Sequence, residues 1–143
     1  MAVKITVDIF SGRPNPEVEL SGKEAQDVLE RLKPAAPLAG DEAERAATPI
    51  LGYRGLIIEQ TGTGATKELP GRFRVTGGSL VGQGLAHRAS DPDFEQSFFS
   101  TKGASKNVKD ASKLRGLIKE ELPRTIELRK KLIIKIQIGR AHV

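Results

Sequence analysis

Cysteine and tryptophan are absent from this sequence, and tyrosine and methionine occur once each. Without cysteine, a disulfide framework, a thiolate nucleophile and a cysteine-ligated metal site are excluded. No apolar run approaches the roughly 20 residues that a membrane-spanning helix needs. The N-terminus alternates in polarity and lacks the continuous apolar stretch of a signal peptide. We therefore expect a soluble, cytoplasmic protein without a membrane span.

The chain of 143 residues is long enough for one domain with a sizeable core. Its charge is unevenly distributed. Residues 1–100 contain 11 Lys/Arg and 14 Asp/Glu, whereas residues 101–143 contain 12 Lys/Arg and 4 Asp/Glu. The two parts therefore carry net charges of −3 and +8, which sum to the overall +5. The basic character belongs to the C-terminal segment and not to the body.

The strongest structural signal lies near the N-terminus, where Val3, Ile5, Val7 and Ile9 alternate with Lys4, Thr6 and Asp8. Side chains of a strand alternate between its two faces, so this pattern predicts a half-buried strand. A constrained turn, Ser11–Pro16, follows it. Gly12 permits a tight turn there, and the prolines hold Arg13 and Asn15 extended.

The rest of the chain divides into shorter predicted elements. Ser21 and Glu24 have the spacing of a capping box and predict a helix that ends before Pro34. Val18–Leu20 reads as a short strand or as the lead into this helix, and Leu38–Pro49 as a flexible connection with at most one helical turn. Strands are predicted at Leu56–Thr61, Arg72–Thr76 and Ser79–Val81, followed by an irregular segment, Gly82–Ala89. A helix capped by Ser90 or Asp91, with Pro92 in its first turn, should end at Gly103, and a further helix is predicted at Lys106–Leu122. Ile126–Ile136 fits either a helix or a strand.

This order of elements predicts an α+β fold, a two-layer sandwich with a small, mostly antiparallel sheet and helices on one face. Residues 1–100 would form the α+β core, and residues 101–137 a basic helical C-terminal segment of the same domain. The last six residues, Ile138–Val143, match the translation of a common short-read sequencing adapter that ends in a stop codon. We expect that these six residues are an artefact and that the natural reading frame is truncated near Ile136.

Two segments carry a resemblance to other proteins. FSGRPNP near the start and LGYRG before a predicted strand, together with the Ser-x-x-Glu helix start and the Asp-Pro helix start, resemble a family of small uncharacterised proteins. The resemblance covers about residues 3–100 and implies no activity. The basic segment after Thr101 lies outside it.

Four polar or aromatic residues on two constrained loops form the candidate ligand-binding set: Arg13, Asn15, Tyr53 and Arg54. Tyr53 and Arg54 lie between two glycines, where the backbone can be approached closely. If both loops meet at one end of the sheet, their guanidinium groups could hold an anionic small molecule. The alternative, which we favour, is that each arginine ties down loop carbonyl groups.

The predicted basic helix offers a second candidate site, for nucleic acid or another polyanion. Lys106, Lys109, Lys113 and Lys119 fall on one of its sides, and neutralisation of phosphates dominates such binding. No aromatic residue interleaves with these lysines, which argues against base stacking. Nucleic-acid binding is therefore possible but not favoured.

Other motifs point away from catalysis. Gly62-Thr63-Gly64 lacks the Gly-Lys-Ser/Thr ending of a phosphate-binding loop, and Pro70 follows too soon for a helix. His87, with Asp91 and Asp93 nearby, lacks the second nitrogen ligand usual in transition-metal sites. We expect no metal, no cofactor and a non-enzymatic binding or interaction module, whose partner is a protein or an anionic small molecule. The alternative is an enzyme that acts on an anionic small molecule through Arg13, Arg54 and His87.

Overall fold

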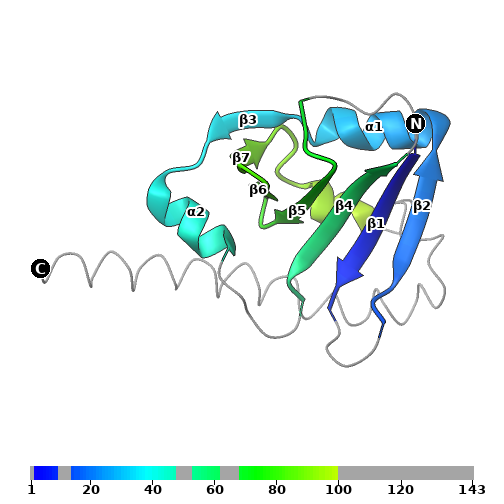
Figure 1. Ribbon diagram of the computed structural model, residues 1–143, viewed down its shortest axis with the longest axis horizontal. Helices are drawn as coiled ribbons and strands as arrows, with labels where there is room; N and C mark the ends of the chain where they lie inside the picture. The colour runs from blue at the N-terminus through cyan, green and yellow to red at the C-terminus, as the bar shows by residue number, and fades with distance from the viewer. Residues whose placement is uncertain (1, 10–13, 48–52, 62–67, 100–143) are drawn as a thin grey trace, which may run out of the picture.

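The computed structural model describes residues 2–9, 14–47, 53–61 and 68–99, without the side chains of 44–47 (Figure 1). Seven strands form one sheet in the order β2-β1-β4-β5-β6-β7-β3, and neighbouring strands in this order are antiparallel. The strands are β1 Ala2–Asp8, β2 Glu17–Ser21, β3 Pro34–Pro37, β4 Gly55–Thr61, β5 Arg72–Thr76, β6 Ser79–Gly82 and β7 Leu85–Ala89. Three helices accompany the sheet: α1 Gly22–Arg31, α2 Gly40–Ala47 and α3 Phe94–Phe98. The fold is thus α+β, as predicted.

Strand β1 lies between β2 and β4 and follows its predicted alternation. Val3, Ile5 and Val7 are fully buried, whereas Lys4 and Thr6 on the opposite face are half-buried. Since successive side chains of a strand point to opposite faces, β1 gives one face to the core and the other to the polar surface.

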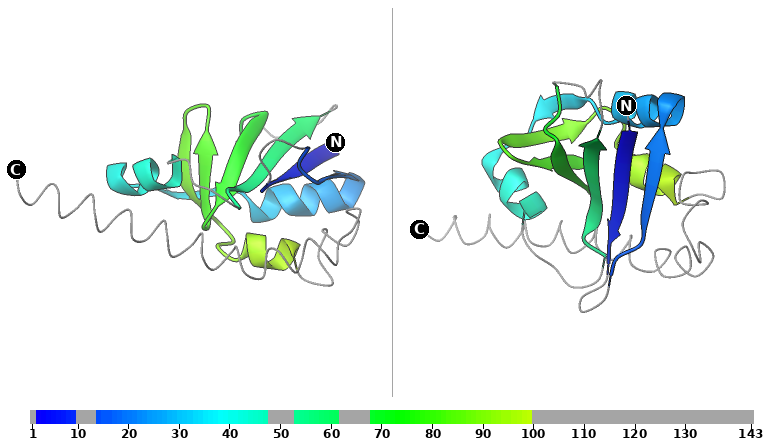
Figure 2. Two further views of the ribbon diagram at one scale, coloured as in Figure 1. Left: turned by 90° about the horizontal axis from the view of Figure 1, so that it is seen from below. Right: turned by 45° about the vertical axis from the view of Figure 1, so that its right-hand side comes forward.

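Helices α1 and α3 lie on the same side of the sheet, as Figure 2 shows in its left view. Both contribute apolar side chains to the core: Ala25, Val28 and Leu29 from α1, and Phe94 and Phe98 from α3. Phe99 follows α3, and its ring meets those of Phe98 and Tyr53 edge to face, with centroids 4.9 and 5.7 Å apart. Edge-to-face pairs at such distances stabilise a core beyond the area that they bury.

Four predicted elements differ in the structure. The segment Pro34–Pro37 was expected only to end a helix, but it forms β3 against β7. Gly82–Ala89 was expected to be irregular, but Leu85–Ala89 forms β7 after a tight turn at Gln83-Gly84. The predicted connection Leu38–Pro49 contains the eight-residue helix α2 instead of at most one turn. Helix α3 begins only after Asp93, beyond the predicted Ser90 or Asp91.

The capping box predicted at the start of α1 is not formed. Ser21 is the N-cap residue, in an extended conformation, but its side chain makes no capping hydrogen bond. The helix starts at Gly22 directly after β2 ends, and the φ of Gly22 is +58°. A positive φ is a conformation that glycine adopts without steric cost, so the glycine makes the abrupt strand-to-helix transition possible. The predicted helix Lys106–Leu122 and the ambiguous Ile126–Ile136 lie outside the described residues.

Candidate functional site

Asp8, the last residue of β1, is the centre of a charged cluster. Its side chain is only 10% exposed. Arg54 donates to Asp8 Oδ1 from Nε at 3.1 Å and from Nη2 at 2.8 Å. Arg74 donates from Nη1 to the other oxygen, Oδ2, at 2.5 Å. One carboxylate is therefore shared between guanidinium groups from two different parts of the chain.

The backbone of β4 and β5 brings these groups together. Arg54 immediately precedes β4, and its backbone N–H donates to the Asp8 carbonyl at 2.7 Å. Gly55 pairs with Asp8 and has a φ of +123°. A Cβ on Gly55 would lie 3.4 Å from Cγ of Arg74 and 2.5 Å from the Val75 carbonyl oxygen. Because Gly55 has no side chain, β5 can approach β4 closely here, and Arg74 extends past Gly55 towards Asp8.

Asn15 connects the turn after β1 to the same cluster. Its Oδ1 accepts a hydrogen bond from the Ile9 N–H at 3.1 Å, and its Nδ2 donates to Asp8 Oδ1 at 3.3 Å. The two candidate loops therefore meet at one end of the sheet, where Asn15 and Arg54 both contact Asp8. Arg13, the third polar residue of the candidate set, lies outside the described residues.

The electrostatics of the cluster follow from its hydrogen bonds. Burial by itself raises the pKa of Asp8, but the hydrogen bonds and charges of Arg54 and Arg74 outweigh it and lower the pKa below the ordinary value. One carboxylate and two guanidinium groups leave a net charge of +1. Arg74 Nη1 also donates to the Arg54 carbonyl at 3.3 Å, and the Arg74 side chain is 32% exposed. Arg74 thus combines a structural contact with an accessible positive charge.

Tyr53 belongs to the core and not to the cluster surface. It is fully buried, and its hydroxyl donates to Glu95 Oε2 at 2.5 Å. The other carboxylate oxygen of Glu95 accepts from the Gly78 N–H at 3.4 Å. Because buried polar groups need hydrogen-bond partners, this contact lets both side chains lie inside the core. Tyr53 therefore supports the adjacent Arg54 from within, and direct contact with a ligand stays a prediction.

A second candidate site runs along β2, at the edge of the sheet. The Val7 N–H donates to the Pro16 carbonyl at 2.8 Å, and Val18 and Leu20 are opposite Ile5 and Val3. In an antiparallel pair, hydrogen-bonded positions recur at every second residue. Pro16, Val18 and Leu20 are thus the positions directed at β1.

Glu17 and Glu19, by the same alternation, direct their backbone N–H and C=O groups away from β1. In the part of the chain that the structure describes, β2 ends the sheet and no hydrogen-bond partner is recorded for these groups. Unpaired groups along an edge are a template for another strand. Strand β2 is consequently a candidate docking edge.

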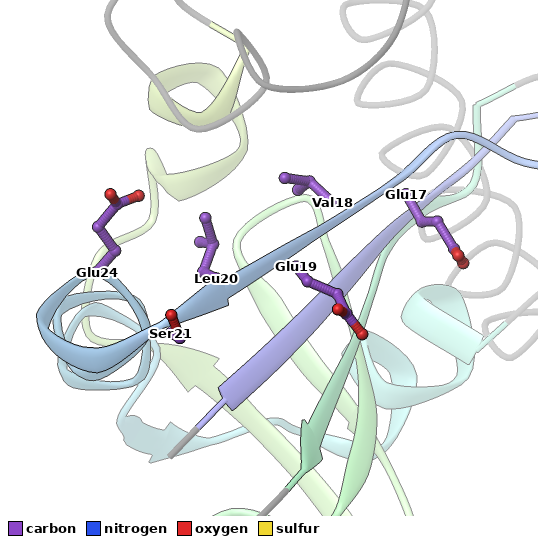
Figure 3. A pocket seen from close by; sticks show the side chains of 6 residues that line it. All are labelled: Glu17, Val18, Glu19, Leu20, Ser21 and Glu24. Atoms are coloured by element: carbon purple, nitrogen blue, oxygen red, sulfur yellow. The ribbon is translucent and has the colours of Figure 1, made fainter.

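A shallow groove of about 590 Å³ lies along this edge (Figure 3). Its lining is Glu17, Val18, Glu19, Leu20 and Ser21 from β2, and Glu24 from α1. Figure 3 shows the Val18 and Leu20 side chains on one side of β2, where Glu24 also lies, and Glu17 and Glu19 on the other. Three lining residues carry a carboxylate, and none carries a positive charge.

The opposite edge of the sheet is built differently. Strand β3 has proline at both ends, Pro34 and Pro37, and its pairing with β7 shifts register between them. Proline has no N–H to donate, and prolines and bulges are common devices that prevent a further strand from pairing. Of the two described edge strands, β2 contains no proline, whereas β3 contains two.

The remaining predicted sites are dispersed or outside the described residues. His87 lies on β7, and β5 and β6 separate that strand from β4, beside which Arg54 lies. Asp91 is paired with Arg31, and its Oδ1 accepts from the Asp93 N–H at 3.0 Å in the turn before α3. No cluster of three or more potential metal ligands, and no helix suited to crossing a membrane, occurs within the described ranges. The candidate polyanion-binding residues Lys106, Lys109, Lys113 and Lys119 lie outside them.

The sequence analysis missed Asp8 and Arg74. Both occupy the polar positions of alternating strands, and such positions are usually just solvated. Their contact joins residues 66 positions apart and depends on the registers of β1 with β4 and of β4 with β5. The only signal in the sequence was the opposite charge of strand residues on the polar face.

Comparisons with known proteins give no independent assignment. No family model, no curated protein and no solved structure matches this chain. The resemblance carried by FSGRPNP and LGYRG therefore stays a prediction, and the candidate sites have to be judged on their geometry.

Proposed function

We propose that the protein is a non-enzymatic interaction module that binds an extended protein segment as an additional strand on β2. The observation that carries this proposal is the outward direction of the backbone groups of Glu17 and Glu19 at an edge where the described residues provide no partner. Strand addition uses such groups for affinity and the neighbouring side chains for specificity.

The layer arrangement supports this proposal. We infer a two-layer sandwich, because α1 and α3 lie together on one side of the sheet (Figure 2). These helices leave the outer edge of β2 without a covering element among the described residues. The groove along β2 then provides alternating apolar and acidic surfaces for the side chains of an added strand.

The separation of the polar candidates also favours a binding module over an enzyme. An enzyme for an anionic small molecule would need Arg54 and His87 around one pocket. These residues lie at strands separated by β5 and β6. The guanidinium group of Arg54 is instead engaged with Asp8, at 2.8 Å from Nη2 to Oδ1.

The test of strand addition uses Glu19→Pro on the full chain. This change removes an N–H that points away from β1, so the pairing of β2 with β1 should persist. Twelve-residue peptides enriched from a displayed random library by the wild type should lose binding to Glu19→Pro. Glu19→Gln is the matched control, since it keeps the N–H, and it should keep strand-dependent binding. If no peptide is enriched, or if Glu19→Pro binds as well as wild type with an unchanged melting temperature, the proposal is wrong.

A second candidate function is the binding of a small anion at the cluster of Asp8, Asn15, Arg54 and Arg74. The observation that favours it is the net positive charge of the cluster together with the 32% exposure of Arg74. Inorganic phosphate should then raise the melting temperature of the wild type but not that of Arg74→Ala. Arg74→Lys should give an intermediate shift, because lysine keeps the charge but loses the planar fork. An equal shift in wild type and Arg74→Ala would exclude this site.

A further inference from the structure

We infer that the segment accepted by β2 is basic, with Lys or Arg at every second position and apolar residues between them. This inference rests on the proposed function and specifies the chemistry of the partner. It follows from the side chains on the two faces of β2 and from the nearby side chains of β1, β4 and α1.

On the polar face of the sheet, the edge carries an excess of negative charge. The Glu17 side chain is 57% exposed, and its carboxylate lies 3.9 Å from Lys4 Nζ. The same ammonium lies 3.7 Å from Glu59, which also lies 4.0 Å from Arg72 Nε. Lys4 and Arg72 thus face three carboxylates, those of Glu17, Glu19 and Glu59. For Glu19, the described residues contain no ion-pair partner. A strand added at the usual spacing of about 4.8 Å would place its polar-face side chains directly beside Glu17 and Glu19.

On the other face, the neighbours of an added strand are mainly apolar. Val18 and Leu20 are 7% and 5% exposed and join the hydrophobic core. Apolar side chains of an added strand would extend this core past the present edge of the sheet. Glu24 lies on the same side of β2 as these two residues (Figure 3). A long basic side chain at one end of the partner could reach it, with its aliphatic stem on the apolar surface.

A second copy of this chain is the less suitable occupant. Two β2 strands side by side would bring Glu17 and Glu19 of one copy close to the same carboxylates of the other. Like charges on adjacent strands destabilise the pairing, whereas Glu–Lys or Glu–Arg pairs stabilise it. The acidic side chains thus disfavour pairing between the β2 strands of two copies and favour pairing of β2 with a basic segment.

The experiment compares two peptides that differ only in the sign of charge. One has Lys and the other Glu at three alternate positions, with Val between them and Gly-Ser at both ends. Fluorescence anisotropy with the full chain at low ionic strength should show at least about tenfold tighter binding of the Lys peptide. Two cross-strand pairs, with Glu17 and Glu19, change from attraction to repulsion between the two peptides, and together they contribute enough to reach that factor. The double change Glu17→Lys with Glu19→Lys should reverse the preference.

The controls separate failure of this inference from failure of the proposed function. A Lys peptide with N-methyl groups on its edge-facing amides should not bind, because strand addition needs those N–H groups. Equal binding of the Lys and Glu peptides, lost on N-methylation, would overturn the basic partner but leave strand addition intact. Binding that survives both N-methylation and Glu19→Pro would overturn strand addition itself.

Two other occupants give distinct results, and either result would overturn a separate basic partner. A second copy would show as a dimer in sedimentation that Glu19→Pro abolishes. The chain's own basic segment would show as peptide binding that occurs only after Lys106, Lys109, Lys113 and Lys119 are all changed to Glu. Binding of the Lys peptide to a monomeric wild-type chain supports a separate basic partner.

Discussion

Asp8 connects three segments of the chain through a single side chain. Its carboxylate accepts from Asn15 in the turn after β1, from Arg54 before β4 and from Arg74 on β5. Hydrogen bonds between charged groups contribute more than neutral ones, and a buried carboxylate with two guanidinium partners is therefore a major determinant of local order. We regard the cluster as a clamp between the end of β1 and the start of β4.

Asp8→Asn should destabilise the fold by about 1.5–3 kcal/mol at neutral pH, because charge-assisted hydrogen bonds to both arginines are lost. The folded pKa of Asp8 is lowered relative to the unfolded chain. Its contribution is therefore fully present above the unfolded pKa, near 3.9, and is lost as the pH falls through the folded pKa.

Urea denaturation of wild type and Asp8→Asn across this range measures that effect directly. The difference in unfolding free energy should be constant above about pH 5 and should shrink progressively towards strongly acidic pH. Asp27→Asn, on the exposed surface of α1, is the control and should show no comparable pH-dependent difference. A difference between wild type and Asp8→Asn that grows on acidification would contradict the clamp.

The sequence allowed part of this cluster to be predicted. The stiff turn indicated Asn15, and the flanking glycine indicated Arg54, because both features restrict the backbone locally. Asp8 and Arg74 could not be found in this way. Their meeting depends on strand order and register, which are set by long-range packing and not by neighbouring residues.

At the scale of elements, the predictable strands were those with a strong local pattern. The runs Val3–Ile9 and Arg72–Thr76 alternate in polarity, and Gly77-Gly78 marks the hairpin between β5 and β6. By contrast, β3 consists of Pro-Ala-Ala-Pro and has no strand propensity of its own. It is held by β7, partly through the Leu38 N–H, which donates to the Ala86 carbonyl at 3.0 Å. Tertiary pairing overrides composition there.

Helix α2 illustrates a different limit. Its sequence is rich in alanine, a strong helix former, but the surrounding prolines indicated a connection. The prolines lie outside its eight residues, Gly40–Ala47, and therefore do not interrupt it. The acidic residues of its first turn, Asp41 and Glu42, complement the helix dipole. Glu42 also pairs with Arg88 on β7 at 2.8 Å, which ties the helix to the sheet.

Gly55→Ala tests how closely β4 and β5 approach at the cluster. The substitution places a Cβ 2.5 Å from the Val75 carbonyl oxygen at a φ of +123°, so the backbone has to shift. We expect a loss of about 1–3 kcal/mol from conformational strain alone. Gly71→Ala is the matched control, since nothing lies within 4 Å of its added Cβ, and it should stay within about 0.5 kcal/mol of wild type. Equal effects of the two changes in thermal or urea unfolding would show that the close approach at Gly55 is absent.

At the scale of the whole molecule, the two described edges of the sheet differ in their prolines and in their outward backbone groups. One described edge, β3, is short and carries two prolines, whereas the other, β2, presents outward backbone groups beside three carboxylates. The sequence indicated β2 only as a strand or a helix lead, so its position at the edge was beyond prediction. The proposed strand addition is therefore expected at β2 and not at β3.

Residue-resolved amide hydrogen exchange is the most direct measurement of that claim. In the free full-length protein, the amides of Val18 and Leu20 should be protected by their bonds to β1, whereas those of Glu17 and Glu19 should exchange nearly as fast as in an unfolded chain. Saturating Lys peptide should slow exchange at Glu17 and Glu19 strongly, and the Glu peptide at equal concentration should not. If the Glu19 amide is already protected in the free protein, or stays fast with the Lys peptide bound, β2 is not the docking edge.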